Sequence, residues 1–296
     1  MSLALGQLLL SGILIGGVYG LISVGLTLIF GVMKIVNFAH GEFLMMAMYA
    51  TYWLQVLLGW DPYVSLALVL PASFLFGLAV ERLVIRPGIG KPHLVVVFAT
   101  MGLSVLLQNL ALFLWRGDYR PVRGVLGETT WILGPFRMNA SLGVAFLVSV
   151  GVTLALLPWL RLTDSGKALR ATIQNRQVAT LMGINVYRVF GRTFALGTAL
   201  VGLAAALIAP TFPTYPSVGL SFVILAYVVV VLGGLGSVPG ALLGGICIGV
   251  VESLTGYLIA PTLSQLFSFL VFLLVLVVRP AGLLGRRDAV LAEWSR

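Results

Sequence analysis

Long apolar segments, repeated from one end of the chain to the other, constrain this sequence more than any other feature. A membrane-spanning helix needs roughly 20 consecutive, mostly apolar residues to cross the hydrocarbon core of a bilayer. Segments of this kind recur here between short polar clusters, and we predict that each forms one transmembrane helix. The predicted segments are 5–30, 41–58, 63–84, 94–114, 142–160, 189–209, 220–235, 240–259 and 264–278.

The composition excludes a water-soluble fold. Of the 296 residues, 60% are hydrophobic and 9% are charged, whereas soluble domains contain about 25% charged residues. The apolar segments follow one another without a Ser/Pro-rich linker, which predicts a single transmembrane domain over residues 1–296. We expect an all-α polytopic membrane protein with about nine transmembrane helices, eight to ten being compatible with the hydropathy.

The distribution of Lys and Arg predicts the orientation of the chain. No charged residue occurs in 1–33, so the positive region of a secretory signal peptide is missing and the first segment is expected to remain as a span. Four of the 18 basic residues lie in the loop 115–140, and the positive-inside rule places the side with the other fourteen in the cytoplasm. These are Lys34, Arg82, Arg86, Lys91, Arg161, Lys167, Arg170, Arg176, Arg188, Arg192, Arg279, Arg286, Arg287 and Arg296. We predict an outer N-terminus, an inner C-terminal tail at 279–296 and an inner loop at 161–188.

Several function classes are excluded at this point. The net charge of +9 comes from basic residues in loops at one membrane face, so it requires no nucleic-acid partner. Cys247 is the single cysteine and lies in an apolar segment, where it offers neither a disulfide nor a metal cluster. The chain lacks the G-x-x-x-x-G-K-[ST] motif that cradles ATP phosphates, and its loops contain no catalytic constellation. We expect no enzyme activity and no bound cofactor.

The loop 161–188 has the chemistry of two short surface helices. Asp164 or Ser165 can cap the first helix, because a side-chain oxygen at that position accepts hydrogen bonds from free backbone N–H groups. Asn175 can cap the second in the same way. The second helix is predicted over 176–182.

The predicted second helix carries an apolar patch made of Val178, Leu181 and Met182. Gly183 follows it and suits the left-handed conformation that ends a helix. So short a helix is not stable alone and needs a surface to pack against. That surface is either the membrane interface or a groove on a partner protein, and the loop by itself leaves both alternatives open.

A polar cluster interrupts the apolar pattern at Ile35–Glu42, where Asn37, His40 and Glu42 surround Gly41. A charged side chain at mid-bilayer costs roughly 2.5 to 3.5 kcal/mol on insertion scales, so Glu42 would face a water-filled path or a partner there. The alternative is a cytoplasmic turn with His40 in water and Glu42 near a helix N-terminus, where its charge suits the helix dipole.

Glycine marks two further features. Small-residue ridges at helical spacing predict close helix packing, and they consist of Gly12, Gly16, Gly20, Gly240, Gly244, Gly245 and Gly249. A glycine-rich stretch with one proline predicts a tight turn between two helices, and its key residues are Gly233, Gly234, Gly236 and Pro239. Downstream, Glu252 is the only charge between residues 240 and 259, which favours an interior position, either as a structural hydrogen-bonding group or as a pathway residue.

Three motifs, in this order along the chain, resemble the permease subunits of the branched-chain (hydrophobic) amino acid ABC importer family. The first, G-L-T-L-I-F-G-V-M-K-I-V-N-F-A-H-G-E-F, contains that family's N-F-A-H-G-E signature. The second, G-K-A-L-R-A followed by N-R-Q-V-A-x-L-M-G-I-N-V, is similar to its cytoplasmic coupling motif, although the family often has an acidic residue where Gln174 or Asn175 stands. The third, V-L-G-G-L-G-S-V-P-G-A, is similar to its V-L-G-G-x-G-S-x-x-G-A segment.

The resemblance implies a fold like that of the type II ABC importer permeases, without the extra N-terminal helix of the ribose-type sugar permeases. It implies that the inner loop couples ATPase closure to the membrane, through Gly166, Leu169, Arg170, Arg176, Ala179, Leu181, Met182 and Gly183. It also favours a translocation pathway near Asn37, His40, Gly41 and Glu42, to which Glu252 is added because of its isolated charge.

The implied assembly lies in the bacterial inner membrane. A homologous second permease subunit, or a second copy of this chain, would complete the pathway within the lipid bilayer. Two cytoplasmic ATPases would use ATP and Mg²⁺, and a periplasmic binding protein would deliver branched-chain or related amino acids. Similar permeases carry urea, amides or aromatic acids. The alternative class is an ion-coupled secondary transporter that uses His40, Glu42 and Glu252 as a relay.

Overall fold

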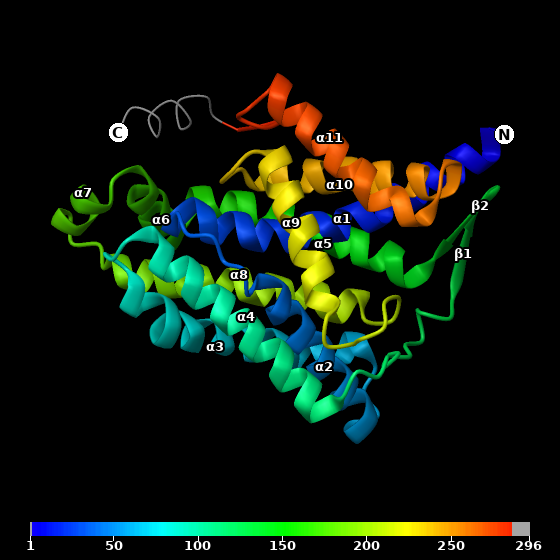
Figure 1. The fold of residues 1–296 in the computed structure, drawn as a ribbon, viewed down its shortest axis with the longest axis horizontal. Helices are drawn as coiled ribbons and strands as arrows, with labels where there is room; N and C mark the ends of the chain where they lie inside the picture. The colour runs from blue at the N-terminus through cyan, green and yellow to red at the C-terminus, as the bar shows by residue number, and fades with distance from the viewer. Residues whose placement is uncertain (1, 286–296) are drawn as a thin grey trace.

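The computed structural model describes residues 2–285 and shows an elongated bundle of helices (Figure 1). Its longer helices are α1 (Ser2–Met33), α2 (His40–Leu58), α3 (Pro62–Val80), α4 (His93–Trp115), α5 (Ala140–Leu162), α8 (Val186–Ile208), α9 (Val218–Gly233), α10 (Val238–Leu258) and α11 (Ser264–Val278). Each predicted segment coincides with one of them. Within residues 2–285, seven helices are long and apolar enough to cross a membrane. Helix α9 is shorter, and α2 is less apolar because polar residues occupy its start.

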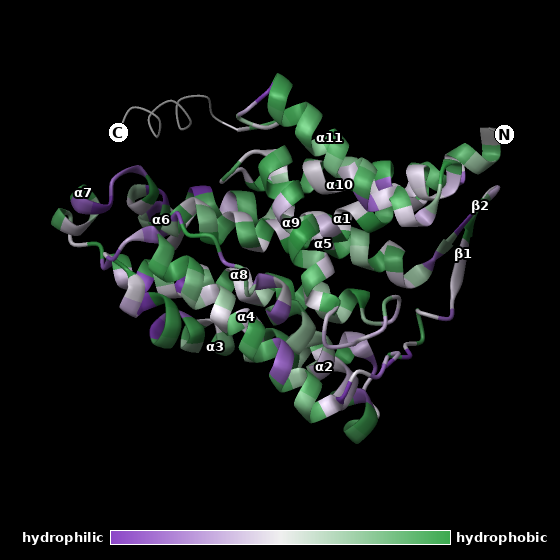
Figure 2. Cartoon of the chain, in the orientation of Figure 1, coloured by the Kyte–Doolittle hydropathy of each residue, from purple (hydrophilic) through white to green (hydrophobic). Residues whose placement is uncertain are grey.

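Short elements cap the two ends of the bundle. Helices α6 (Asp164–Gln174) and α7 (Arg176–Leu181) lie at one end, and the antiparallel strands β1 (Thr130–Leu133) and β2 (Phe136–Asn139) lie at the other, beside the N-terminus (Figure 1). Hydrophobic colouring dominates the helices between them, and hydrophilic residues gather in the end segments (Figure 2). Three single-turn elements complete the chain: a π-helix η1 (Glu81–Ile85) and the 3₁₀ turns η2 (Arg86–Gly88) and η3 (Pro261–Leu263).

The predicted glycine ridges pack α1 directly against α10. A Cβ atom added to Gly16 would lie 2.6 Å from the carbonyl oxygen of Gly245, and one added to Gly249 would lie 2.4 Å from that of Gly12. At these positions backbone touches backbone, because any side chain would hold the helices apart. This confirms the prediction of close packing through small residues.

Helix α8 occupies the interior and contacts α1, α2 and α3. Gly197 of α8 meets Gly25 of α1 so closely that a Cβ atom on Gly197 would lie 2.7 Å from the Gly25 carbonyl oxygen. On the α3 side, a Cβ atom on Gly77 would lie 2.8 Å from Thr198. Helix α8 is thus the shared packing partner through which three membrane helices are held together.

The connection between α1 and α2 is extended rather than helical. Residues 34–39 leave the end of α1 and run back toward the middle of the bundle before α2 begins (Figure 1). Lys34, the first of them, has a positive φ of 57° and is exposed. His40 is fully buried, so the alternative of a turn with His40 in water is wrong.

Candidate functional site

Helix α2 begins inside the bundle with three buried polar side chains. Asn37, His40 and Glu42 are 0%, 0% and 1% exposed. The Asn37 side-chain oxygen accepts a hydrogen bond from the backbone N–H of Ala39 at 3.2 Å, which holds the turn just before the helix. The His40 Nε2 atom lies 3.1 Å from the carbonyl oxygen of Ile22 on α1. The predicted polar cluster is therefore held by contacts within the fold.

We call residues 37–42, where non-helical backbone leads into α2, the polar break. Helix α4 supplies hydroxyl groups to this polar break. Ser104 donates a hydrogen bond to the Glu42 Oε1 atom at 3.2 Å. The Thr100 hydroxyl oxygen lies 3.4 Å from the backbone N–H of Phe38, from which it accepts. Neither hydroxyl belonged to the predicted site, because a lone Ser or Thr in an apolar helix is ordinary in sequence and only the fold aligns the two with residues 37–42.

Several polar atoms at the break have no hydrogen-bond partner within the described chain. They are the Asn37 Nδ2, His40 Nδ1, Glu42 Oε2 and Tyr227 hydroxyl atoms. A buried polar group without a partner costs free energy, so such atoms are rare in folded proteins. Asn37, His40 and Glu42 stand just before or at the start of α2, and Tyr227 lies on α9, so donors and an acceptor from two segments are available to a polar molecule.

The start of α2 crosses the start of α9 at two glycines. A Cβ atom on Gly41 would lie 2.0 Å from the carbonyl oxygen of Gly219, and one on Gly219 would lie 2.5 Å from that of Gly41. Both helices therefore present backbone to one another at the polar break. Gly41 is placed there by close approach and not by a positive φ.

Glu252 lies apart from this cluster. It is half-buried on α10, and its carboxyl group faces the Tyr19 hydroxyl group of α1. Among residues 2–285, no hydrogen bond or ion pair joins it to Asn37, His40 or Glu42. The structure does not bring the predicted pathway residues into one group.

The loop 161–188 forms the two predicted helices, with one correction. The cap of α6 is Thr163, whose hydroxyl oxygen accepts from the Gly166 N–H at 3.1 Å, so the prediction of Asp164 or Ser165 was wrong. Thr163 has the extended backbone of a cap, while Asp164 is already helical and pairs with Lys167 at 3.1 Å.

Helix α7 follows its prediction closely. The Asn175 side-chain oxygen accepts hydrogen bonds from the N–H groups of Gln177 at 3.0 Å and Val178 at 3.1 Å, which confirms the cap. Regular helix ends at Leu181, one residue earlier than predicted, and Gly183 has the expected left-handed conformation with φ 82°.

The apolar patch of α7 points away from the bundle. Leu181 is 85% exposed, Met182 is 77% exposed and Val178 is half exposed. Elsewhere on α7, Ala179 is buried against the rest of the fold, and so is Leu169 of the preceding helix α6. Arg176 places its guanidinium group 4.7 Å from the ring centre of Phe190 on α8, which ties α7 to the membrane helix that follows it.

Two other predicted coupling residues have structural roles. A Cβ atom on Gly166 would lie 2.4 Å from the Leu160 carbonyl oxygen, so only glycine fits between α6 and the end of α5. Arg170 donates a hydrogen bond to the Arg161 carbonyl oxygen at 3.1 Å. Both residues fix the angle at which α6 leaves the membrane helix.

The glycine-rich stretch forms the predicted tight turn between α9 and α10. Gly234 and Gly236 have φ values of 106° and 82°, and a Cβ atom on Gly233 would lie 2.2 Å from the carbonyl oxygen of Gly240. Pro239 stands in the first turn of α10. The turn borders a cavity of about 740 Å³ that α1, α5 and α6 also line, with Lys34, Arg161 and Arg170 among its residues.

One ion pair at this end of the bundle was not predicted. Glu81 is fully buried and accepts two hydrogen bonds from Arg86, at 2.8 Å and 3.2 Å. Its signal in the sequence was an acidic residue at the end of an apolar segment, followed five residues later by Arg. That spacing separates the two side chains by about 140° on a regular α-helix, so hydropathy alone gave no reason to pair them.

The fold and the site define the class of protein: a multi-pass membrane protein whose apolar helices enclose a polar break and carry exposed helices at one end. The family comparison then identifies the family. The chain belongs to the family described as "Branched-chain amino acid transport system / permease component", whose model matches residues 8–276. It is therefore a transport subunit of the bacterial inner membrane and not an enzyme, and no cofactor is expected of such a permease.

Curated relatives agree with this assignment. The chain is 31% identical to the "High-affinity branched-chain amino acid transport system permease protein LivH" of Escherichia coli (strain K12), over 95% of this chain and 96% of that protein. It is 32% identical to the corresponding BraD protein of Pseudomonas aeruginosa, with the same coverage. A "Probable branched-chain amino acid transport permease protein LivH" of Methanocaldococcus jannaschii is 28% identical, over 93% of this chain and 89% of that one.

A solved structure supports the fold. A chain of "PsaBC from Streptococcus pneumoniae in complex with Fab" superposes with a TM-score of 0.50, covering 91% of each chain at 15% sequence identity. Together with the family match, this supports the predicted fold of a type II ABC importer permease.

Proposed function

We propose that this chain is the transmembrane subunit of an ATP-driven importer for branched-chain or related amino acids, with residues 1–296 forming one domain. The observation that carries the proposal is the exposed apolar patch of α7, combined with membership of the permease family. A cytoplasmic ATPase would cover this patch, a homologous permease or second copy would complete the pathway, and a periplasmic binding protein would supply the substrate.

The proposed orientation has the N-terminus outside and the loop with α6 and α7 inside. Its support is the charge asymmetry, because the basic loops gather at the end of the bundle opposite the β-hairpin (Figure 1). Cysteine labelling tests it in a Cys247→Ala background. A cysteine at Glu128 would react in intact cells, whereas one at Thr180 would react only after permeabilisation. The reverse pattern would contradict the orientation.

We place the translocation pathway at the break before α2. Non-helical backbone at membrane depth is tolerated where it lines a cavity or is buried in protein, and the unpartnered groups of Asn37, His40 and Glu42 can bind a polar substrate. Gly41 allows the crossing with α9 that forms one wall. We also assign Glu252 to the pathway because it is an isolated charge within an apolar segment. It lies on α10, at a position separate from Asn37, His40 and Glu42.

The docking of α7 on the ATPase is tested with one charged substitution. Leu181→Asp would bury a carboxylate in an apolar groove without a counter-ion, which costs several kcal/mol. The permease should insert normally but lose the ATPase during co-purification. Gln177→Asp, which adds the same charge to the polar flank of the same helix, serves as the matched control and should keep it.

Undiminished ATPase recovery with Leu181→Asp, together with substrate-stimulated ATP hydrolysis, would rule out the docking role. A helix resting on lipid would instead give weaker membrane anchoring with the ATPase complex intact.

The amino acid substrate is proposed from the relatives, whose names specify branched-chain amino acids. Binding measurements on the periplasmic protein encoded with this permease would test it. Tight binding of leucine, isoleucine or valine supports the proposal, and selective binding of urea, an amide or an aromatic acid would replace the substrate while leaving the importer class unchanged.

A further inference from the structure

The cytoplasmic end of α3 contains a π-helical turn that aligns two opposite charges. In η1, the backbone N–H of Arg86 bonds to the carbonyl oxygen of Glu81, five residues earlier. This turn stacks residues that a regular α-helix would separate by about 140°. The Glu81 carboxylate and the Arg86 guanidinium group consequently form a two-point ion pair, with Nη2–Oε2 and Nε–Oε1 distances of 2.8 Å and 3.2 Å.

The ion pair lies against the first turns of α8. The Arg86 Nη2 atom is 3.4 Å from the Tyr187 carbonyl oxygen, and the guanidinium group lies 5.8 Å from the Tyr187 ring centre. One turn later, Gly191 provides the space: a Cβ atom there would lie 3.2 Å from the Glu81 Oε2 atom. The ion pair therefore contacts α8 in three ways: at the Tyr187 ring, at the Tyr187 carbonyl oxygen and beside Gly191.

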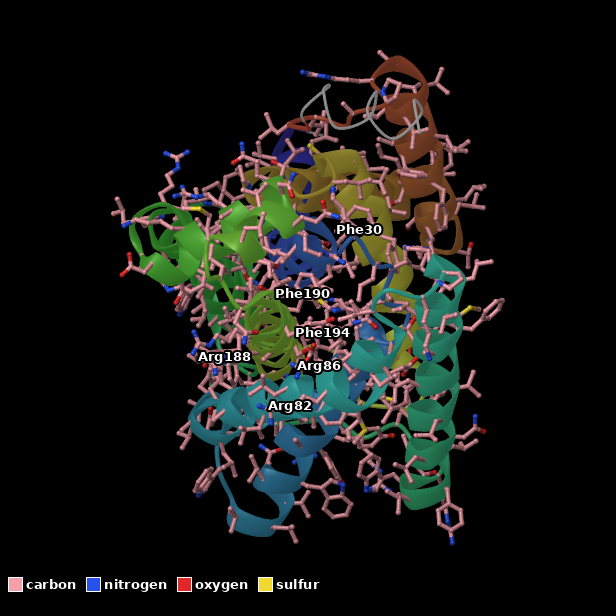
Figure 3. All side chains as sticks on the ribbon, turned by 90° about the vertical axis from the view of Figure 1, so that its left-hand side faces the viewer. Phe30, Arg82, Arg86, Arg188, Phe190 and Phe194 are labelled. Carbon is pink, nitrogen blue, oxygen red and sulfur yellow. The ribbon has the colours of Figure 1, made fainter. Side chains whose placement is uncertain are left out.

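The same turns of α8 carry the contact with α7. Arg176 of α7 stacks over Phe190, which lies between Tyr187 and Gly191. One turn farther into the membrane, Phe194 packs edge-to-face on Phe43 of α2, with ring centres 6.0 Å apart. Figure 3 looks onto this end of the bundle and shows Arg86, Phe190 and Phe194 gathered around α8.

We propose that Glu81 and Arg86 are positioning residues, which fix the start of α8 to α3 so that a displacement of α7 moves both helices together. The inference rests on the proposed coupling role of α7. Arg86 is suited to it because a planar guanidinium group engages a carboxylate in one orientation only, whereas a lysine would form a freely rotating point contact. The Glu81 carboxylate is fully buried, and the Arg86 side chain is 37% exposed.

The test uses the complete importer, with its ATPases and binding protein, in proteoliposomes. The readout is the coupling ratio, the number of substrate molecules imported per ATP hydrolysed. Arg86→Lys should lower this ratio about fivefold, in the range by which residues remote from both sites modulate coupling, while ATPase recovery stays normal. Arg82→Lys is the matched control, since Arg82 is exposed one turn away, and should behave as wild type.

A double variant separates positioning from stability. Glu81→Met alone or Arg86→Met alone leaves an unpaired group at the site, but replacing both partners of a buried ion pair with apolar residues is often neutral for stability. The double variant should recover the wild-type melting temperature and still show the lowered coupling ratio. A wild-type ratio in the double variant would mean that the pair serves stability only and would overturn the proposal.

The experiments distinguish a failure of this positioning proposal from a failure of the docking role of α7. A wild-type ratio in Arg86→Lys, with ATPase recovery lost in Leu181→Asp, would overturn the positioning role and leave the docking assignment intact. Lost ATPase recovery in Arg86→Lys would likewise contradict it, because a positioning residue acts after docking.

Discussion

Helices α4 and α8 have the same length and opposite surroundings. Each contains 23 residues and is apolar enough to span a membrane, yet 83% of the most apolar stretch of α8 is buried against only 22% for α4. The buried helix contains eight Gly and Ala residues against three in the exposed helix, which instead contains eleven Leu and Val residues against seven. Gly and Ala are thus concentrated on the interior helix, although Phe190 and Phe194 of α8 are also fully buried.

This difference follows from the solvent. In a bilayer, the lipid tails are as apolar as leucine, so burying a large apolar side chain gains little, and helices associate where small residues allow close approach. Phe113 of α4 is 84% exposed in the chain, a costly arrangement in water and an ordinary one against lipid or a second permease. In this protein small residues mark the interior, whereas apolarity alone does not.

The largest expected effect comes from enlarging a small residue of α8. Gly197→Leu would drive a side chain into the backbone of α1 at Gly25, and overpacking of this kind costs typically 1–3 kcal/mol or more, up to about a hundredfold loss of folded protein. Gly102→Leu in α4 is the matched control, because no atom lies within 4 Å of an added Cβ there. Size-exclusion recovery after detergent extraction measures both. Equal recovery of Gly197→Leu and Gly102→Leu would contradict the difference in packing between α8 and α4.

A second prediction concerns the polar break that the interior helices enclose. Glu42→Ala should lower transport about tenfold or more, since hydrogen bonds to charged groups contribute roughly 1.5–3 kcal/mol, while the complex still assembles. Ser104→Ala removes one donor to the same carboxylate and should lower transport about threefold. Uptake assays in proteoliposomes compare them. A wild-type transport rate with Glu42→Ala would contradict the assignment of the polar break to the translocation pathway.

The smallest of the three main effects is expected outside the membrane, where helix ends meet water and depend on caps instead of packing. Asn175→Ala removes the acceptor of two backbone N–H groups at the start of α7 and should cost about 1 kcal/mol of helix stability. The affinity of the ATPase for the permease should fall about fivefold, as titration of detergent-solubilised components would show. Asn175→Asp keeps an accepting oxygen and should restore it. An unchanged affinity with Asn175→Ala would mean that ATPase binding does not require the capped first turn of α7 to be folded beforehand.

The sequence predicted the features that local chemistry determines. Hydropathy located the membrane helices, the glycine spacing predicted close helix packing without naming the helices that meet, and Asn175 with Gly183 bounded α7 to within one residue. These signals are encoded by neighbouring residues along the chain.

Features that depend on distant segments were missed. Thr100 and Ser104 serve the α2 break from another helix, and Glu81 pairs with Arg86 only because the helix adopts a π turn. The β-hairpin at residues 130–139 was also unpredicted, since two four-residue strands carry too short an alternation to stand out in a polar loop. Thr163 replaced the predicted cap because three adjacent polar residues could each fill that role, and the end of α5 decided among them.

The crossing of α2 and α9 at Gly41 and Gly219 has a mechanical consequence. Side chains that interlock between two helices must change rotamers together before the helices can turn, and each fixed rotamer restricts the motion. Two glycines have no rotamers. At this point backbone meets backbone, so a rotation of one helix on the other would be restricted by the flanking side chains of Glu42 and Val223 and not by interlocking between the crossing residues themselves.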